Sequence, residues 1–145
     1  MSDADEHAPR GEDLNEGILA EFRANQGKVG GLFENMNLAL LTTTGAKTGR
    51  RTTTPITYFT EAGRYLLVAS NFGRDHHPAW FHNILQDPVV TLEIGTEQFR
   101  GRATITEGAE RDRLFAYVSE KIPGYRKHQS GTTRIIPVVV IERIE

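Results

Sequence analysis

The chain has 145 residues, a formal net charge of −2 and no cysteine. This length fits one domain with an ordinary core, and the lack of cysteine excludes disulfides, thiolate catalysis and cysteine-based zinc sites. The charge balance provides no basic field for nucleic acid, the N-terminal residues contain no apolar signal-peptide core, and no later run is long enough for a membrane span. We therefore expect a soluble cytoplasmic domain.

The chain opens with a polar, acidic segment over residues 1–13. This segment has too little apolar surface to offset the entropy of ordering, so we expect a disordered tail followed by one domain over residues 14–145. From Leu14 onward, apolar residues recur on one helical stripe. The stretch GKVGG, residues 27–31, predicts the end of this helix.

The middle and the end of the chain predict strands joined by tight turns. The predicted strands cover residues 38–44, 52–59, 64–70, 89–94, 97–106 and 135–144. The turn signals EAGR and Gly95-Thr96 predict two hairpins. The last strand is apolar on both faces, which is typical of a central strand.

Two further helices are predicted between these strands. Pro78 suits the first turn of a helix, where its missing N–H costs little, and Asp87-Pro88 ends that helix. A second helix covers residues 109–122, before Pro123-Gly124. About six strands in consecutive hairpins, three helices and no regular βαβ alternation predict an α+β fold, an antiparallel barrel or sheet with helices packed outside.

Common catalytic signatures are absent from the sequence. GAKTGRR lacks the spacing of a Walker phosphate-binding loop, and neither G-x-G-x-x-G nor G-x-S-x-G occurs. His76, His77 and His82 lie close together but lack the i, i+4 spacing of a zinc-binding helix. We therefore expect no metal site.

The stretch TTTGAKTGRRTTTP, residues 42–55, has two interpretations. As a hairpin loop, its glycines supply positive φ angles while Lys47, Arg50 and Arg51 keep a sheet edge soluble. As an anion cradle, the glycines let backbone N–H groups approach an oxyanion, and the hydroxyls and cations add charge-assisted hydrogen bonds. The residues by themselves favour neither interpretation.

Two other segments could border a flat ring. In residues 68–83, small side chains at a strand end lead into a helix whose N-terminal amides could contact a polar ring edge. Within this segment we favour core packing for the ring of Trp80. Near the end of the chain, Tyr125 or His128 could donate a hydrogen bond or a proton, although Tyr125 is equally suited to packing.

These segments, in combination and in this order, resemble the deazaflavin-dependent nitroreductase family of actinobacteria. The likeness covers residues 14–144 and rests on AEFRANQGKVGG, LLTTTGAKTG, Pro78-x-Trp80-x-x-Asn83 and RIIPVVV. The chain looks most like the F420-dependent reductases linked with quinone, coumarin and aflatoxin reduction. The resemblance implies a split β-barrel that binds coenzyme F420, an oligoglutamylated 8-hydroxy-5-deazaflavin.

The resemblance also implies where the coenzyme binds and how the acceptor is reduced. The loop over residues 46–52 would hold the phosphate and oligoglutamate tail, with Lys47 the firmest match. Ser70 and Tyr125 would polarise an acceptor that takes a hydride from C5 of reduced F420, such as a quinone or a coumarin- or aflatoxin-like lactone or ester. The residues implied to bind the coenzyme are Ala46, Lys47, Thr48, Gly49, Arg50, Arg51, Thr52, Pro55, Ile56, Val68, Ala69, Ser70, Asn71, Pro78, Ala79, Trp80, Phe81, His82, Asn83 and Tyr125.

The sequence departs from the family pattern in its basic loop. Ala46 and Thr52 stand where family members can carry arginine. Arg50 or Arg51 would then supply the positive charge from a shifted position.

The residues leave two other functions open, an FMN-binding split-barrel oxidoreductase and a protein that binds F420 without catalysis. Ile122 and His128 replace tyrosines of the substrate pocket in the nitroreductase itself, which argues against activation of its nitroimidazole drugs. The expected partner is a small-molecule hydride acceptor. We expect no nucleic acid and no integral membrane segment, while peripheral membrane contact and a homodimer stay open.

Overall fold

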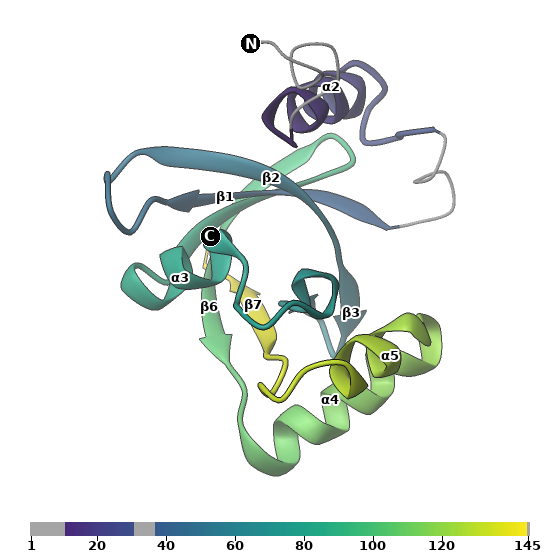
Figure 1. The fold of residues 1–145 in the computed structure, drawn as a ribbon. Helices are drawn as coiled ribbons and strands as arrows, with labels where there is room; N and C mark the ends of the chain where they lie inside the picture. The colour runs from purple at the N-terminus through teal and green to yellow at the C-terminus, as the bar shows by residue number, and fades with distance from the viewer. Residues whose placement is uncertain (1–10, 31–36, 145) are drawn as a thin grey trace, which may run out of the picture.

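The structure is a computed structural model that describes residues 11–30 and 37–144. Within them, seven antiparallel strands form one sheet in the order β2-β1-β5-β6-β7-β4-β3. The sheet curls into a half-barrel with helices packed around it (Figure 1). This arrangement confirms the predicted α+β split-barrel class.

The bounds of the elements follow the predicted pattern closely. The strands are β1 (Leu38–Thr44), β2 (Arg51–Thr57), β3 (Phe59–Glu61), β4 (Arg64–Val68), β5 (Val89–Ile94), β6 (Glu97–Ile105) and β7 (Val138–Arg143). The helices are α2 (Gly11–Ala24), the short 3-10 helix η2 (Asn71–Gly73), α3 (Ala79–Gln86), α4 (Gly108–Lys121) and α5 (Gly124–Ser130). Both predicted hairpins form, and β7 lies centrally between β6 and β4 as predicted.

Three features differ from the sequence prediction. Helix α2 begins at Gly11, so residues 11–13 of the expected tail are helical, while residues 1–10 lie outside the described residues. The strand predicted over 52–59 is divided at Tyr58, where the chain passes from pairing with β1 to pairing with β4. Helix α5 replaces a predicted polar loop, because Tyr125 is its one buried residue and a single apolar contact creates no detectable periodicity.

Strands β4 and β7 carry apolar side chains on both faces, because successive residues of a strand point to opposite sides. One face packs inside the curl with α3, in an inner cluster formed by Ala39, Leu41, Leu67, Ala69, Phe81, Ile84, Val90, Leu92, Phe99, Ala103, Val139 and Ile141. The other face packs against α4 and α5, in an outer cluster formed by Phe59, Leu66, Val68, Leu114, Phe115, Val118, Tyr125, Ile136, Val138 and Val140. Each fully buried Val or Leu stabilises the fold by roughly 1.5–3 kcal/mol.

Helix α2 covers a separate part of the sheet. Phe22 of α2 and Val29 pack on Leu38 and Leu40 of β1, on the face of β1 that points away from the inner cluster. Figure 1 shows α2 and the α4–α5 pair at opposite ends of the curled sheet. Across the described ranges, no helix combines the length and the apolar character that a membrane crossing requires.

Charged side chains attach α4 to the β3–β4 hairpin. The carboxylate of Glu61 accepts hydrogen bonds from Arg113 of α4 and from Arg64, the latter at 2.8 Å. The hydroxyl of Tyr117 donates to the carbonyl oxygen of Thr60 at 2.7 Å. The hydrogen bonds from Arg113 and then Arg64 lower the pKa of Glu61 to about 2.

The loop between β4 and α3 has a strained backbone. Asn71, Phe72 and Gly73 have φ angles of 48°, 59° and 80°, in the left-handed region that costs energy for side chains other than glycine. A Cβ at Gly73 would lie 3.1 Å from Cα of His128, so α5 approaches this loop at the distance that glycine permits. Contact with α5 therefore fixes the loop that leads into α3.

This contact predicts the effect of Gly73→Ala. The new methyl group combines left-handed strain with the clash against His128, so we expect a loss of about 1–3 kcal/mol in the free energy of unfolding, measured by urea denaturation. Gly63→Ala is the matched control, since Gly63 has a φ of 78° and a Cβ at this position would meet no atom within 4 Å. Equal losses in both variants would show that the His128 contact is unimportant.

The Glu61 contacts predict a pH dependence of stability. The carboxylate has a lower pKa in the folded protein than its ordinary value of 4.5, so its stabilising effect is present above pH 4.5 and is lost as the pH falls toward 2. Wild type should therefore exceed Glu61→Gln in free energy of unfolding at neutral pH, and the difference should vanish near pH 2. Arg113→Gln should reduce this pH dependence. A difference that is constant with pH would contradict the assignment.

Candidate functional site

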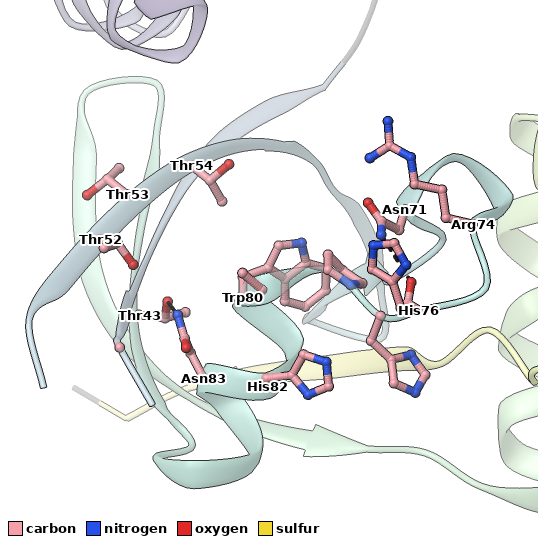
Figure 2. A pocket seen from close by; sticks show the side chains of 14 residues that line it. Thr43, Thr52, Thr53, Thr54, Asn71, Arg74, His76, Trp80, His82 and Asn83 are labelled. Atoms are coloured by element: carbon pink, nitrogen blue, oxygen red, sulfur yellow. Dashed lines mark hydrogen bonds between the residues drawn. The ribbon is translucent and has the colours of Figure 1, made fainter. Parts of the chain in front are cut away.

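An open cavity of about 720 Å³ lies between the β1–β2 hairpin, the strained loop and the start of α3. Its volume is within the range of about 300–1,000 Å³ that is common for small-molecule sites. Figure 2 shows threonines of β1 and β2 on one side and Asn71, Arg74 and His76 on the other. The lining residues are Thr43, Gly45, Thr52, Thr53, Thr54, Asn71, Arg74, His76, His77, Pro78, Ala79, Trp80, His82 and Asn83.

Strand register creates the threonine side of the cavity. Thr43 of β1 pairs with Thr52 of β2, and Thr54 lies two residues further along the same strand. Residues with this spacing share one face of a sheet. Thr53 between them also borders the cavity, but its hydroxyl lies 2.8 Å from that of Thr42 on the other face of the sheet. The cavity therefore receives a row of hydroxyl groups from an otherwise ordinary hairpin.

Asn83 joins α3 to this hairpin through both ends of its side-chain amide. Its Nδ2 donates to Oγ1 of Thr43 at 3.0 Å, and its Oδ1 accepts from the backbone N–H of Ala46 at 2.9 Å. The two contacts fix the loop after β1 against the first turns of α3. Asn83 therefore has a positioning role in addition to lining the cavity.

The loop over residues 45–50 is a hairpin turn, which confirms one interpretation of the basic stretch. The N–H of Gly45 donates to the carbonyl oxygen of Arg50 at 2.7 Å, and the carbonyl oxygen of Gly45 accepts from the N–H of Gly49 at 2.9 Å. The N–H of Arg50 donates to Oγ1 of Thr48. Within the described ranges, the backbone N–H groups of Lys47 and Thr48 have no acceptor. The anion cradle stays a prediction, narrowed to the tip of the turn.

The three cations of this stretch have different surroundings. Arg51 donates to Oγ1 of Thr44 at 2.8 Å and to Oγ1 of Thr91 at 2.9 Å, so its guanidinium lies across the outer side of the sheet. The exposed side chains of Lys47 and Arg50 have no hydrogen bond or ion pair with any described residue. Lys47 and Arg50 are therefore available to an anion, whereas Arg51 is already engaged.

Trp80 contributes the large aromatic surface of the cavity. Its ring is half-buried, packs against the inner cluster and also lines the cavity, so the predicted packing role describes only part of its surroundings. Figure 2 shows the indole in the middle of the lining, between the β2 threonines and Asn71. An aromatic face beside hydroxyl groups suits a flat heterocycle with polar edges.

The structure brings together only some of the predicted site residues. Those that line the cavity are Thr52, Asn71, Pro78, Ala79, Trp80, His82 and Asn83. Among the others, Ile56 and Phe81 pack in or against the inner cluster, and Val68 lies in the outer cluster. Pro55 pairs with Leu40 on the sheet face that α2 covers.

The side chains of Ser70 and Tyr125, which are predicted to polarise the acceptor, are both buried. Ser70 is nine-tenths buried, immediately before the cavity residue Asn71, and its hydroxyl has no hydrogen bond with the described part of the chain. Tyr125 lies in the outer cluster with its ring in edge contact with Phe59, and burial raises its pKa to about 12. This packing does not favour the prediction that Tyr125 supplies a proton at the cavity.

Several cavity residues were missed by the sequence interpretation. Thr43 and Thr54 become visible only when the strand register is known, because they alternate with residues of the opposite face. Arg74, His76 and His77 come from an irregular loop that carries no periodic signal. Although histidines gather here, residues 11–30 and 37–144 contain no group of three His, Asp or Glu side chains that could hold a metal ion.

Comparisons with known proteins identify the family of the chain. Residues 18–143 match the family model described as F420H(2)-dependent quinone reductase. An F420H(2)-dependent quinone reductase of Mycobacterium tuberculosis is 37% identical over 128 residues, which are 86% of each chain. The structure of an F420-H2 dependent reductase, FDR-A, superimposes with a TM-score of 0.67 and 36% identity, covering 73% of this chain and 94% of that chain.

A second solved structure, described as a domain-swapped dimer, has a TM-score of 0.69 and 32% identity and covers 92% of this chain and 100% of that one. The extent of the family match and the identity to the mycobacterial reductase together establish the relationship. The chain belongs to the family of F420H(2)-dependent quinone reductases, which are oxidoreductases that use coenzyme F420.

Proposed function

We propose that this protein reduces quinones with F420H2 in the cavity between the β1–β2 hairpin and α3. The observation that carries the proposal is the cavity itself, in which the indole of Trp80 and a row of hydroxyls adjoin a turn whose Lys47 and Arg50 side chains have no partner among the described residues. When bound, reduced F420 supplies a hydride, and a proton from water or a hydroxyl completes the hydroquinone. The residues of the chain bind and orient the two reactants.

The chemistry of the cavity fits a deazaflavin ring. Trp80 offers an apolar face, and the hydroxyls of Thr43, Thr52 and Thr54 offer donors and acceptors for the polar edge of a heterocycle. Holding two reactants in contact geometry can lower a barrier by roughly 7–11 kcal/mol, so orientation is a large part of what the protein contributes. We assign this orienting role to Trp80 and the threonine row.

The turn at residues 45–50 suits the anionic tail of the coenzyme. Lys47 and Arg50 supply charge, and the free N–H groups of Lys47 and Thr48 supply donors at the same tip. Charge-assisted hydrogen bonds of this kind are stronger than neutral ones. We assign the charge of the missing family arginines to Arg50, because Arg51 is held by Thr44 and Thr91.

The acceptor range is a further part of the proposal. Ser70 lies next to the cavity residue Asn71, and its hydroxyl has no hydrogen bond with any described residue, so we assign it the polarisation of the acceptor carbonyl. Conjugated lactones and esters, including coumarin- and aflatoxin-like compounds, present the same electron-poor carbonyl system as quinones. We include them as acceptors.

A cytoplasmic homodimer is proposed for the assembled protein. The absence of cysteine is consistent with a reducing compartment. The similarity to a structure described as a domain-swapped dimer supports self-association. Sedimentation of the full chain at micromolar concentration distinguishes a dimer from a monomer.

Variants of the basic turn test the placement of the tail. Lys47→Ala and Arg50→Ala should each raise the Kd for F420 about fivefold, since an exposed charge contact contributes about 1 kcal/mol. The effect should shrink in high salt, and turnover at saturating coenzyme should stay unchanged. Arg51→Ala is the matched control and should leave the Kd within about twofold. A larger effect at Arg51 than at Arg50 would contradict the assignment.

An acceptor panel tests the proposed activity. Purified protein with F420H2 should reduce a benzoquinone and a coumarin. The reaction is measured as the return of the absorbance of oxidised F420. Titration with FMN is the control, and we expect no saturable binding. Uptake of FMN in preference to F420 would support the flavin alternative. Saturable F420 binding without reduction of any acceptor would support a non-catalytic binding protein.

A further inference from the structure

Arg134 crosses from the segment before β7 to the loop that lines the cavity. Its Nε donates to the carbonyl of Arg74 at 2.8 Å and its Nη2 donates to the carbonyl of Ser70 at 2.7 Å. Its Nη1 lies 3.1 Å from the carbonyl oxygen of Ala69 and 2.9 Å from Nδ1 of His77. Four of the five guanidinium N–H bonds are therefore used in fixing this loop.

The backbone around Arg134 is itself fixed by side chains of α4 and α5. The amide of Gln129 donates to the carbonyl of Arg134 at 2.8 Å and accepts from the N–H of Ile136 at 2.9 Å. Arg111 of α4 donates to the same amide oxygen at 2.7 Å and to the carbonyl of Ile136 at 3.0 Å. The guanidinium of Arg134 is thus held on a rigid support.

The contact with Arg134 determines the tautomer of His77. A guanidinium can only donate hydrogen bonds, so Nδ1 of His77 must be the acceptor and the ring proton must lie on Nε2. Burial lowers the pKa of His77, and the positive charges of Arg134 and His82 lower it further. The ring is therefore neutral near pH 7, with one N–H group.

The position of His77 leaves that N–H group available. The ring lines the cavity and is held against Phe81, with ring centroids 4.6 Å apart. Among the described residues, none accepts a hydrogen bond from Nε2. The three observations place a neutral, pre-oriented donor at the wall of a cavity that otherwise offers hydroxyls and an aromatic face.

We infer that Nε2–H of His77 donates a hydrogen bond to a carbonyl oxygen of the molecule bound in the cavity, and that Arg134 is the positioning residue that fixes this donor. The carbonyl belongs either to the ring of the coenzyme or to the quinone, and this inference rests on the proposed function for that ligand. If the carbonyl belongs to the quinone, a fixed donor stabilises the negative charge that develops on its oxygen as the quinone takes up the hydride. If it belongs to the coenzyme, the donor holds and orients the ring. His77 gives up no proton in this role.

The tautomer can be measured without any ligand. In protein labelled with 15N-histidine at pH 7.5, the signal that disappears in His77→Phe should show a protonated Nε2 and an unprotonated Nδ1. Arg134→Met should convert this signal into a mixture of tautomers. A protonated Nδ1 or a doubly protonated ring in wild type would overturn the inference, and the wild-type spectrum decides this even if the Arg134 variant does not fold.

Two His77 variants then test the contact with the ligand. His77→Phe keeps a ring against Phe81 but removes the donor, whereas His77→Gln keeps an N–H group at a similar distance from the backbone. If the coenzyme carries the carbonyl, the Kd for F420 should rise about 5- to 10-fold in His77→Phe, with kcat/KM for the quinone unchanged at saturating F420H2. If the quinone carries the carbonyl, kcat/KM for the quinone should fall about 5- to 10-fold in His77→Phe, with the Kd for F420 unchanged. His77→Gln should recover part of either loss.

The outcomes separate this inference from the proposed function. Wild-type protein that binds F420 and reduces the quinone, with both His77 variants unchanged in Kd and in kcat/KM, would overturn the donor role of His77 alone. Wild-type protein that binds no F420 would overturn the proposed function together with the contact inferred here.

Discussion

Two-sided burial of β4 and β7 is the constraint on which the rest of the structure depends. These short strands supply apolar side chains to the inner and the outer cluster alike, so both faces of the sheet must be covered. The curl of the sheet covers one face, and α4 with α5 covers the other (Figure 1). Covering the outer face brings α5 against η2, which places the segment before β7 beside the loop that leads into α3.

Two polar side chains then hold the walls of the cavity in place. Asn83 connects α3 to the β1–β2 turn, and Arg134 connects the segment before β7 to the strained loop. Both bind backbone groups of the loops that border the cavity. Around the cavity, the groups without a partner among the described residues include a basic turn tip and one imidazole N–H. The proposals assign the first to the tail of the coenzyme and the second to a carbonyl oxygen of the coenzyme ring or of the quinone, so the anionic tail and the reacting groups are held by different parts of the site.

Much of the fold could be predicted because local patterns specify it. Strands β1 and β5 have the predicted bounds, and the apolar run of β7 indicated its central place. The division at Tyr58 could not be predicted, because a change of strand partner leaves no local pattern. Of the candidate site, the segment over residues 68–83 was recognised, whereas no coenzyme-binding role was predicted for Arg74 and His77 within it, since irregular loops have no periodicity.

The sequence by itself determined most of the helices and strands, the turn between β1 and β2 and the family resemblance, because these depend on residue type and short spacing. Only the tertiary structure decided which side chains meet. It left the Arg50 side chain without a partner among the described residues while engaging Arg51, placed Tyr125 in the outer cluster, and joined His77 to Arg134 across 57 residues of chain. The physical reason is that strand register and packing between distant segments set the direction of each side chain, and neither is encoded in neighbouring residues.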